Sequence, residues 1–310
     1  MEIELRVRND SGIEEALAIG RGLVNTVAVG DDGCIHKVPK SADAVRAREQ
    51  IERAGYKFRI VTPKLPELHI DDMVATMKNL HSIGDNFSLT VNDFGLLYAC
   101  VKHSILPKTI TMGRTIARSQ QDCPWLEHLH KDSREFVEQM RSQNNMYDEQ
   151  KIDFFRNHNA ASIETNWHPQ DSSSLMKSRE RGLRVGIHLG YPSVAFARAC
   201  PIAKYFHKSV PECRDLCVRP MAMNFSQIYS GVDYQRVPLA NAGIYPFLLL
   251  GNVLYSEIFH EPSVNSVREN ADYIIVNSWQ FKNTAELKNF LEKQKMLFES
   301  KEGAHGKTEN

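Results

Sequence analysis

The chain has 310 residues, 42% of them hydrophobic and 25% charged, which is enough to bury the core of one large domain or two ordinary ones. Its 38 basic and 38 acidic side chains cancel, so the formal net charge at pH 7 is zero. This balance argues against a strongly basic nucleic-acid binder and against function through an acidic tail. We therefore expect no nucleic-acid partner.

The amino-terminal sequence MEIELRVRNDSGIEE has no cationic start followed by a long apolar run, so it is unlike a signal peptide. The longest apolar stretch, around 244–250, is too short to span a bilayer and contains Pro246. We expect a cytoplasmic protein without a membrane span. In that compartment cysteines stay reduced, so structural disulfides are not expected.

Short runs rich in β-branched residues alternate with amphipathic stretches. In chain order, the first half predicts strand 2–7, helix 12–23, strand 26–30, helix 42–55, strand 57–63, helix 67–84, strand 87–91, helix 95–105 and strand 109–113. The less regular second half predicts a charged helical region over 125–158, strands 161–166 and 183–190, an irregular and partly buried cap over 223–252, strand 272–278 and helix 284–298.

The alternation of strand and helix is typical of a parallel sheet with crossover helices. Roughly eight such units fit, which favours a TIM-like (β/α)8-type barrel, with an incomplete or distorted version also open, over a doubly wound sheet. No glycine-rich dinucleotide fingerprint follows the first strand. We expect one α/β domain over 1–298 and a polar, disordered tail over 299–310.

Three cysteines with the spacing C-x12-C-x3-C follow the predicted strand 183–190: Cys200, Cys213 and Cys217. This is not the paired spacing of a zinc ribbon. The last two are four residues apart, so one helical turn would place both thiols on one face. A four-iron cluster needs a fourth thiolate, and Cys34 is the best candidate because it also follows a strand.

In a barrel, loops that follow the strands open on the same face, where active sites are built. Of the other cysteines, Cys100 lies in an apolar helical pattern and is predicted to be a small buried side chain, while Cys123 precedes a proline as a spare thiol. On the residues alone an iron–sulfur cluster, a zinc site and free thiols all remain open.

Three segments, TVAVGDDGCIHK, NFSLTVNDFGLLYACVKHSILP and AFARACPIAKYFHKSVPECRDLC, resemble the U-32 peptidase-like (collagenase-like) family, and within it the UbiV-type branch. The resemblance covers about residues 20–260. It implies a 4Fe–4S cluster held by Cys34, Cys200, Cys213 and Cys217. It also implies oxygen-independent hydroxylation of a small aromatic substrate, in the ubiquinone pathway or a recruited biosynthetic route, with prephenate as oxygen donor and a paralogous UbiU-type subunit forming a heterodimer.

Other functions stay open beside this one. The chain could be a non-catalytic, cluster-bearing partner of a related barrel protein, or a family member that hydroxylates RNA or acts as a peptidase. The neutral charge gives no support to an RNA substrate. A departure around Gly190 weakens the peptidase interpretation, because Leu189 precedes it where the family often has His, and Arg184 and Val185 stand where a Glu is expected.

Six further residues are candidates for contact with substrate or cluster: Asn92, Asp93, His188, Tyr191, Arg198 and Arg214. The first two could equally cap the helix that follows them, and His188 could be satisfied by its neighbours in a strand. The two arginines could tune the cluster or hold a substrate carboxylate. Tyr191 could shield the cluster or stack on an aromatic substrate.

Overall fold

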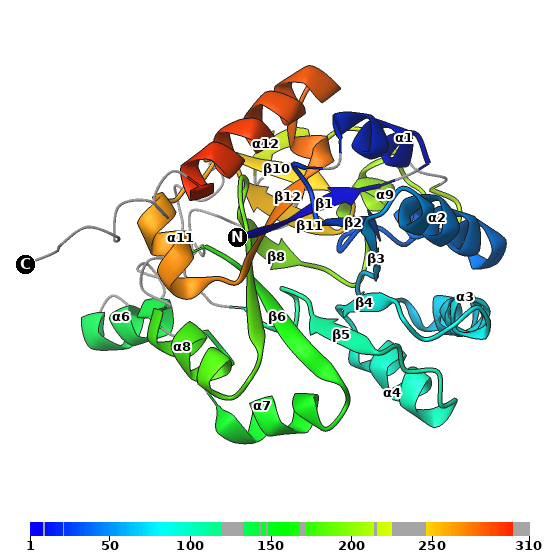
Figure 1. Ribbon diagram of the computed structural model, residues 1–310, viewed down its shortest axis with the longest axis horizontal. Coiled ribbons are helices and arrows are strands. Elements are labelled where there is room, and N and C mark those ends of the chain that lie inside the picture. Colours follow the sequence, from blue (N-terminus) through cyan, green and yellow to red (C-terminus); the bar gives the residue numbers. More distant parts are fainter. Residues whose placement is uncertain are drawn as a thin grey trace, which may run out of the picture.

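In the computed structural model, eight parallel strands close into a barrel in the order β1-β12-β7-β6-β5-β4-β3-β2 (Figure 1). The described residues are 1–8, 10–20, 22–118, 133–142, 144–146, 148–167, 172–213, 216–224 and 246–299. The barrel strands are β1 (Glu2–Val7), β2 (Thr26–Gly30), β3 (Lys57–Val61), β4 (Ser88–Val91), β5 (Thr109–Met112), β6 (Ala160–Asn166), β7 (Arg184–His188) and β12 (Tyr273–Asn277). The predicted TIM-like fold is confirmed, and the barrel is closed.

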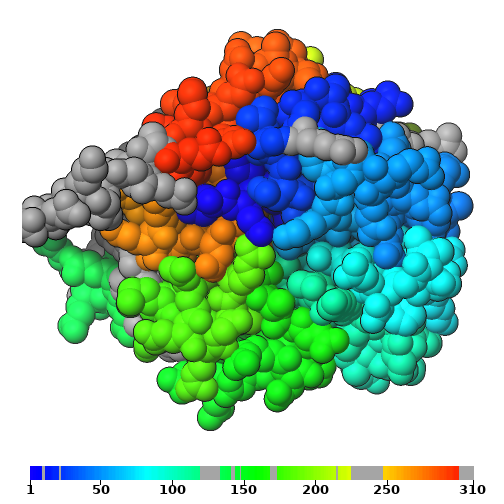
Figure 2. All heavy atoms as spheres, viewed as in Figure 1, coloured from blue at the N-terminus to red at the C-terminus, as the bar shows by residue number. Residues whose placement is uncertain are grey.

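Helices ring the strands, as Figure 1 shows. They are α1 (Asp10–Ile19), α2 (Ser41–Arg53), α3 (Ile70–Ser82), α4 (Phe94–Lys102), α6 (Arg134–Ser142), α7 (Glu149–Arg156), α8 (Ser172–Glu180), α9 (Pro201–Tyr205), α11 (Val264–Asn270) and α12 (Thr284–Glu299), with short 3-10 turns η1 (Ile35–Lys37), η2 (Glu67–His69) and η5 (Ser278–Gln280). The first and last parts of the chain adjoin, since β1 pairs with β12 and α1 contacts α12 (Figure 2). No helix among these is long and apolar enough to cross a bilayer.

Some predicted boundaries were wrong, and left-handed residues explain two of them. The first helix stops at Ile19 rather than residue 23, because Gly20 has φ +100° and ends it. The fourth stops at Lys102, two residues before Ser104 with φ +53°. Glu299, predicted to belong to the tail, is the last residue of α12, and residues 300–310 lie outside the described residues.

A second sheet interrupts the crossover between β7 and β12. Its four antiparallel strands run in the order β8-β11-β10-β9 and are β8 (Ser193–Phe196), β9 (Met221–Asn224), β10 (Pro246–Leu250) and β11 (Val253–Ser256). The prediction of an irregular cap over 223–252 was therefore wrong at 223–224 and 246–250, and residues 225–245 lie outside the described residues. Leu249 and Phe247 are fully buried in the sheet, so these residues form strands with a core of their own.

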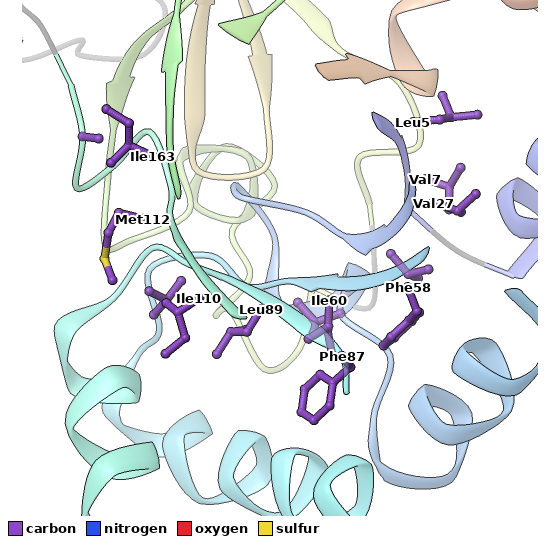
Figure 3. Packing of buried hydrophobic residues seen from close by; sticks show 14 of the residues in the cluster. Leu5, Val7, Val27, Phe58, Ile60, Phe87, Leu89, Ile110, Met112 and Ile163 are labelled. Carbon is purple, nitrogen blue, oxygen red and sulfur yellow. The ribbon is translucent and has the colours of Figure 1, made fainter. Parts of the chain in front are cut away.

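The apolar core lies outside the barrel wall, between the strands and the helices (Figure 3). Alternate strand residues such as Leu5, Val27, Ile60 and Leu89 are almost fully buried in this layer. Side chains alternate between the two faces of a strand, so the residues between them must face the barrel interior.

The barrel interior is charged rather than aliphatic. Glu164 on β6 is fully buried and reaches across the barrel to three other strands, forming ion pairs with Arg6 and Arg59 and accepting a hydrogen bond from Thr90 at 3.0 Å. The Arg59 guanidinium also lies 2.9 Å from the carboxylate of Glu4. Removal of one of these charged side chains would leave its partners buried without an opposite charge. The ion pairs inside the barrel therefore favour this arrangement of strands over others.

Glu164→Gln should lower the free energy of unfolding by about 3–5 kcal/mol, because it leaves two buried guanidinium groups short of a carboxylate. Urea denaturation at pH 7 measures this, with Glu49→Gln on the exposed face of α2 as the matched control. Equal, small effects of the two substitutions would contradict a stabilising role for the interior ion pairs.

Candidate functional site

Cys34 lies in the loop that follows β2, at the carboxyl end of the barrel strands. The loop is held by Asp31, whose side chain accepts a hydrogen bond from the Gly33 amide at 2.6 Å. Burial leaves Cys34 only 7% exposed. Its thiol is therefore fixed within the protein rather than exposed on a surface loop.

The turn between β10 and β11 reaches this loop from the second sheet. The Asn252 amide donates to the Gly33 carbonyl at 2.7 Å. Gly251 has φ +63°, and a Cβ there would lie 2.2 Å from the Gly33 oxygen and 3.3 Å from the Cβ of Cys34. Only glycine fits this close approach.

Three of the other cysteines gather around this contact. Cys200 is the N-cap of α9, and its Sγ lies 3.3 Å from the carbonyl oxygen of Gly251. Cys217 forms a hydrogen bond with the thiol of Cys34 and another with the Gly251 amide. Cys213 lines a small cavity of about 20 Å³ together with Cys34 and Cys200. The structure thus brings together the four cysteines singled out in the sequence.

A further contact ties the two segments together near Cys213. His36, two residues after Cys34, places its Nε2 2.6 Å from the carbonyl oxygen of Val210. The helical turn expected between Cys213 and Cys217 stays a prediction, because residues 214–215 lie outside the described residues.

The cysteine site favours thiolates at some positions more than others. The hydrogen bond from Cys34 lowers the pKa of Cys217 to about 6, with burial opposing it and the guanidinium of Arg8 assisting. The same hydrogen bond, together with burial, raises the pKa of Cys34. Burial also raises the pKa of Cys200, against the effect of the Ala203 amide, whose nitrogen lies 3.5 Å from its sulfur. One proton shared between Cys34 and Cys217 accounts for their opposite shifts.

Within the described part of the chain, the cysteine site contains no ready-made binding site for a single metal ion. Among the described residues, no three His, Cys, Asp or Glu side chains lie close enough together to hold one metal ion. Zinc–sulfur bonds of about 2.3 Å would bring tetrahedral sulfurs to within about 3.8 Å of one another. The four thiols therefore do not form a ready-made zinc site.

Asp93 and Asn92, two other predicted site residues, form hydrogen bonds within the protein. Asp93 is the N-cap of α4, accepting a hydrogen bond from the Gly95 amide at 2.7 Å, so the cap interpretation is confirmed. Asn92 is 1% exposed; its amide donates to the Thr62 carbonyl at 2.8 Å and accepts from the Thr115 amide at 3.1 Å. Both ends of the Asn92 side chain therefore join segments that follow neighbouring strands.

Arg198 and Tyr191 both lie near the cysteines, Arg198 in the small cavity and Tyr191 against the apolar cluster of the second sheet. Arg198 is exposed but lines the same small cavity as Cys34, Cys200 and Cys213. Tyr191 stacks on Trp279, with ring centroids 6.1 Å apart. Arg214 lies outside the described residues, as does Cys123, whereas Cys100 is fully buried in α4 as predicted.

His188 belongs to the charged interior. Its Nε2 lies 3.6 Å from the carboxylate of Glu164, and its Nδ1 lies 3.5 Å from the amide nitrogen of Asn277. Burial lowers its pKa to about 3, assisted by Arg114 and Arg6 and opposed by Glu164. The imidazole is consequently neutral at physiological pH.

Sequence reasoning missed the polar groups that support the cysteine loop. Arg8 forms an ion pair with Asp31 and donates to the Cys217 carbonyl at 3.3 Å, which links β1 to the cysteine segment. Arg114 binds Asp32 at 2.5 Å and the hydroxyl of Tyr255 at 3.2 Å. Two signals pointed to them: charges alternating with apolar residues in strand 2–7, and the acidic pair just before Cys34.

Comparisons with known proteins add little to this geometry. No protein-family model matches the chain, and no curated protein matches it either. Among solved structures, the U32 peptidase Mk0906 is similar over 90% of this chain and 93% of its own, with 12% sequence identity and a TM-score of 0.42. At that level the likeness carries no conclusion about family or activity. The class that fold and site define is a (β/α)8 barrel with four cysteines at its carboxyl end.

Gly251→Ala should destabilise the protein by about 1–3 kcal/mol more than Gly20→Ala, because both glycines have positive φ but only the first lacks space for a methyl group. A Cβ at Gly20 would meet nothing within 4 Å, so that variant isolates the backbone strain, about 1–2 kcal/mol. Thermal and urea unfolding of both variants give the difference. Equal destabilisation would show that the turn does not press on the cysteine loop.

The depressed pKa of His188 predicts a pH-dependent stability. Below the unfolded value near 6.5 the unfolded chain binds a proton that the folded protein excludes, so stability is present above that pH and is lost as pH falls toward 3. Between pH 6.5 and 5 the wild type should lose up to about 1.4 kcal/mol per pH unit more than His188→Gln. Urea denaturation across this range measures the slopes, with His103→Gln at an exposed position as control. Parallel slopes for wild type and His188→Gln would contradict the assignment.

Proposed function

We propose that Cys34, Cys200, Cys213 and Cys217 hold a four-iron, four-sulfide cluster. The observation that carries the proposal is the meeting of two distant segments at the Gly33–Gly251 contact, which gathers these thiols at the carboxyl end of the barrel. Four thiolates are the ligand set that such clusters require.

The surroundings of the sulfurs fit that group. Backbone amides of Gly251 and Ala203 point at the sulfurs of Cys217 and Cys200, and hydrogen bonds of this kind stabilise cluster thiolates. The buried guanidinium of Arg8 lies close enough to lower the pKa of Cys217 and so offsets negative charge.

We further propose that the protein takes part in oxygen-independent hydroxylation of a small aromatic substrate. This finer assignment rests on the resemblance to UbiV-type sequences. In this proposal prephenate is the oxygen donor, and the protein acts in the cytoplasm together with a UbiU-type subunit. When bound, the cluster would supply electron transfer or a Lewis-acidic iron for the oxygen donor. Apolar residues of the second sheet pack around Cys217 and against Cys200, while Arg8 and Arg198 supply positive charge near the site.

The cluster assignment predicts that anaerobically purified protein is brown and contains about four iron and four sulfide per chain. Cys→Ala at positions 34, 200, 213 and 217, made singly, should each lower the iron content by more than half. Cys100→Ala is the matched control, since this cysteine is buried in α4 apart from the site. A colourless wild type with one zinc per chain, or iron loss in the control alone, would overturn the assignment.

A partner subunit can be tested separately. Activity that appears only when a UbiU-type chain is mixed with this one would place the protein as one half of a heterodimer. Full turnover by the isolated chain would contradict that arrangement and leave the cluster assignment intact.

A further inference from the structure

A second cavity, of about 410 Å³, lies next to the cysteine site. It opens where β1 and β12 end, between the segments that follow these strands and the second sheet. Its lining includes Arg8 after β1, Trp279 and Gln280 after β12, and Tyr191 and Arg219 from the segments flanking the second sheet. Cavities of this size accommodate small molecules.

The charged side chains that line the cavity are mostly basic. Among the described lining residues, four are basic, Arg8, Lys37, Arg219 and Lys282, and one is acidic, Glu15. A concave surface with such an excess attracts anions, because the low-dielectric wall strengthens the field of the cations.

Arg8 is one of the two buried cations of this group, with 7% of its surface exposed against 8% for Lys37. Its Nε pairs with Asp31 and its Nη1 donates to the carbonyl of Cys217, but its Nη2 is buried without a hydrogen-bond partner among the described residues. Leaving a buried guanidinium N–H unsatisfied is costly, so an acceptor is expected there.

Gln280 lines the same cavity with a second unsatisfied group. Its side-chain oxygen and nitrogen are both buried without partners in the part of the chain that the structure describes. The amide packs against Gly190, which has φ +100° and where a Cβ would lie 2.1 Å from the Gln280 oxygen. The absence of a side chain at Gly190 therefore leaves space for the Gln280 amide, whose oxygen and nitrogen can still form hydrogen bonds with a ligand.

Aromatic rings form part of the wall. Tyr191 and Trp279 stack with an interplanar angle of 17°, and Phe281 also lines the cavity. Flat ring faces beside basic groups suit a ligand that carries both a planar ring and a negative charge.

We propose that this cavity binds a small aromatic carboxylate, with the carboxylate at Arg8 and Gln280 and the ring against Tyr191 and Trp279. Arg8 joins the cavity to the cysteine site, because the same guanidinium donates to the Cys217 carbonyl. Use of the cavity as the substrate site rests on the proposed function, whereas binding itself needs no cluster.

Titration of the full-length protein with benzoate, followed by calorimetry and tryptophan fluorescence, tests the proposal. Benzoate should bind in a saturable manner at least about 10-fold more tightly than benzyl alcohol, which lacks the charge, and than acetate, which lacks the ring. Benzoate that binds no more tightly than either probe would overturn the proposal. The iron content of the same samples tests the proposed cluster independently of benzoate binding.

Variants locate the site. Arg8→Met should weaken benzoate binding at least about 10-fold. Because this change also leaves Asp31 without its ion pair, the double variant Arg219→Met/Lys282→Met at exposed positions gives an independent test and should weaken binding at least about 3-fold. Arg46→Met/Arg134→Met removes the same charge from exposed faces of α2 and α6 and should leave binding unchanged. Benzoate binding that weakens equally in this control, or that does not weaken in Arg219→Met/Lys282→Met, would contradict the assigned site.

Discussion

The close approach of the β10–β11 turn to the loop after β2 is the contact on which the cysteine site depends. Gly251 and Gly33 meet with no space for a side chain, and the Asn252 amide fixes their register through the Gly33 carbonyl. Around this point the sulfurs of Cys34, Cys200 and Cys217 find hydrogen-bond partners. The antiparallel sheet inserted before β12 thus adds to the contacts that Arg8 and His36 make with the segment of the later cysteines.

The polar side chains inside the barrel connect the strands to the loops at their carboxyl ends, where the cysteines lie. Glu164 joins β6 to β1, β3 and β4 through ion pairs and a hydrogen bond, and His188 extends this network toward the carboxyl end. Arg8 then connects β1 to Asp31 and to the Cys217 carbonyl. The apolar packing that stabilises the fold lies outside the wall, which leaves the inside for groups that hold and orient the cysteine loop.

The sequence predicted most of this fold, since the barrel strands are short, regular and separated by amphipathic helices. The pairing of Cys34 with the later cysteines was predictable because loops after parallel strands share one face. The inserted sheet was not, because MAMN and PFLLL are separated by a long stretch, and their pairing depends on tertiary contacts. Nor did the sequence show which role Asn92 and Asp93 have; only their hydrogen bonds identify a strand-end tie and a helix cap.

The most direct test of the proposed cluster is the location of metal by anomalous X-ray scattering at the iron edge, using crystals grown without oxygen. We expect a compact group of four iron atoms bounded by the sulfurs of Cys34, Cys200, Cys213 and Cys217. A single metal ion at these residues, or iron bound elsewhere in the protein, would contradict the cluster and the function proposed from it.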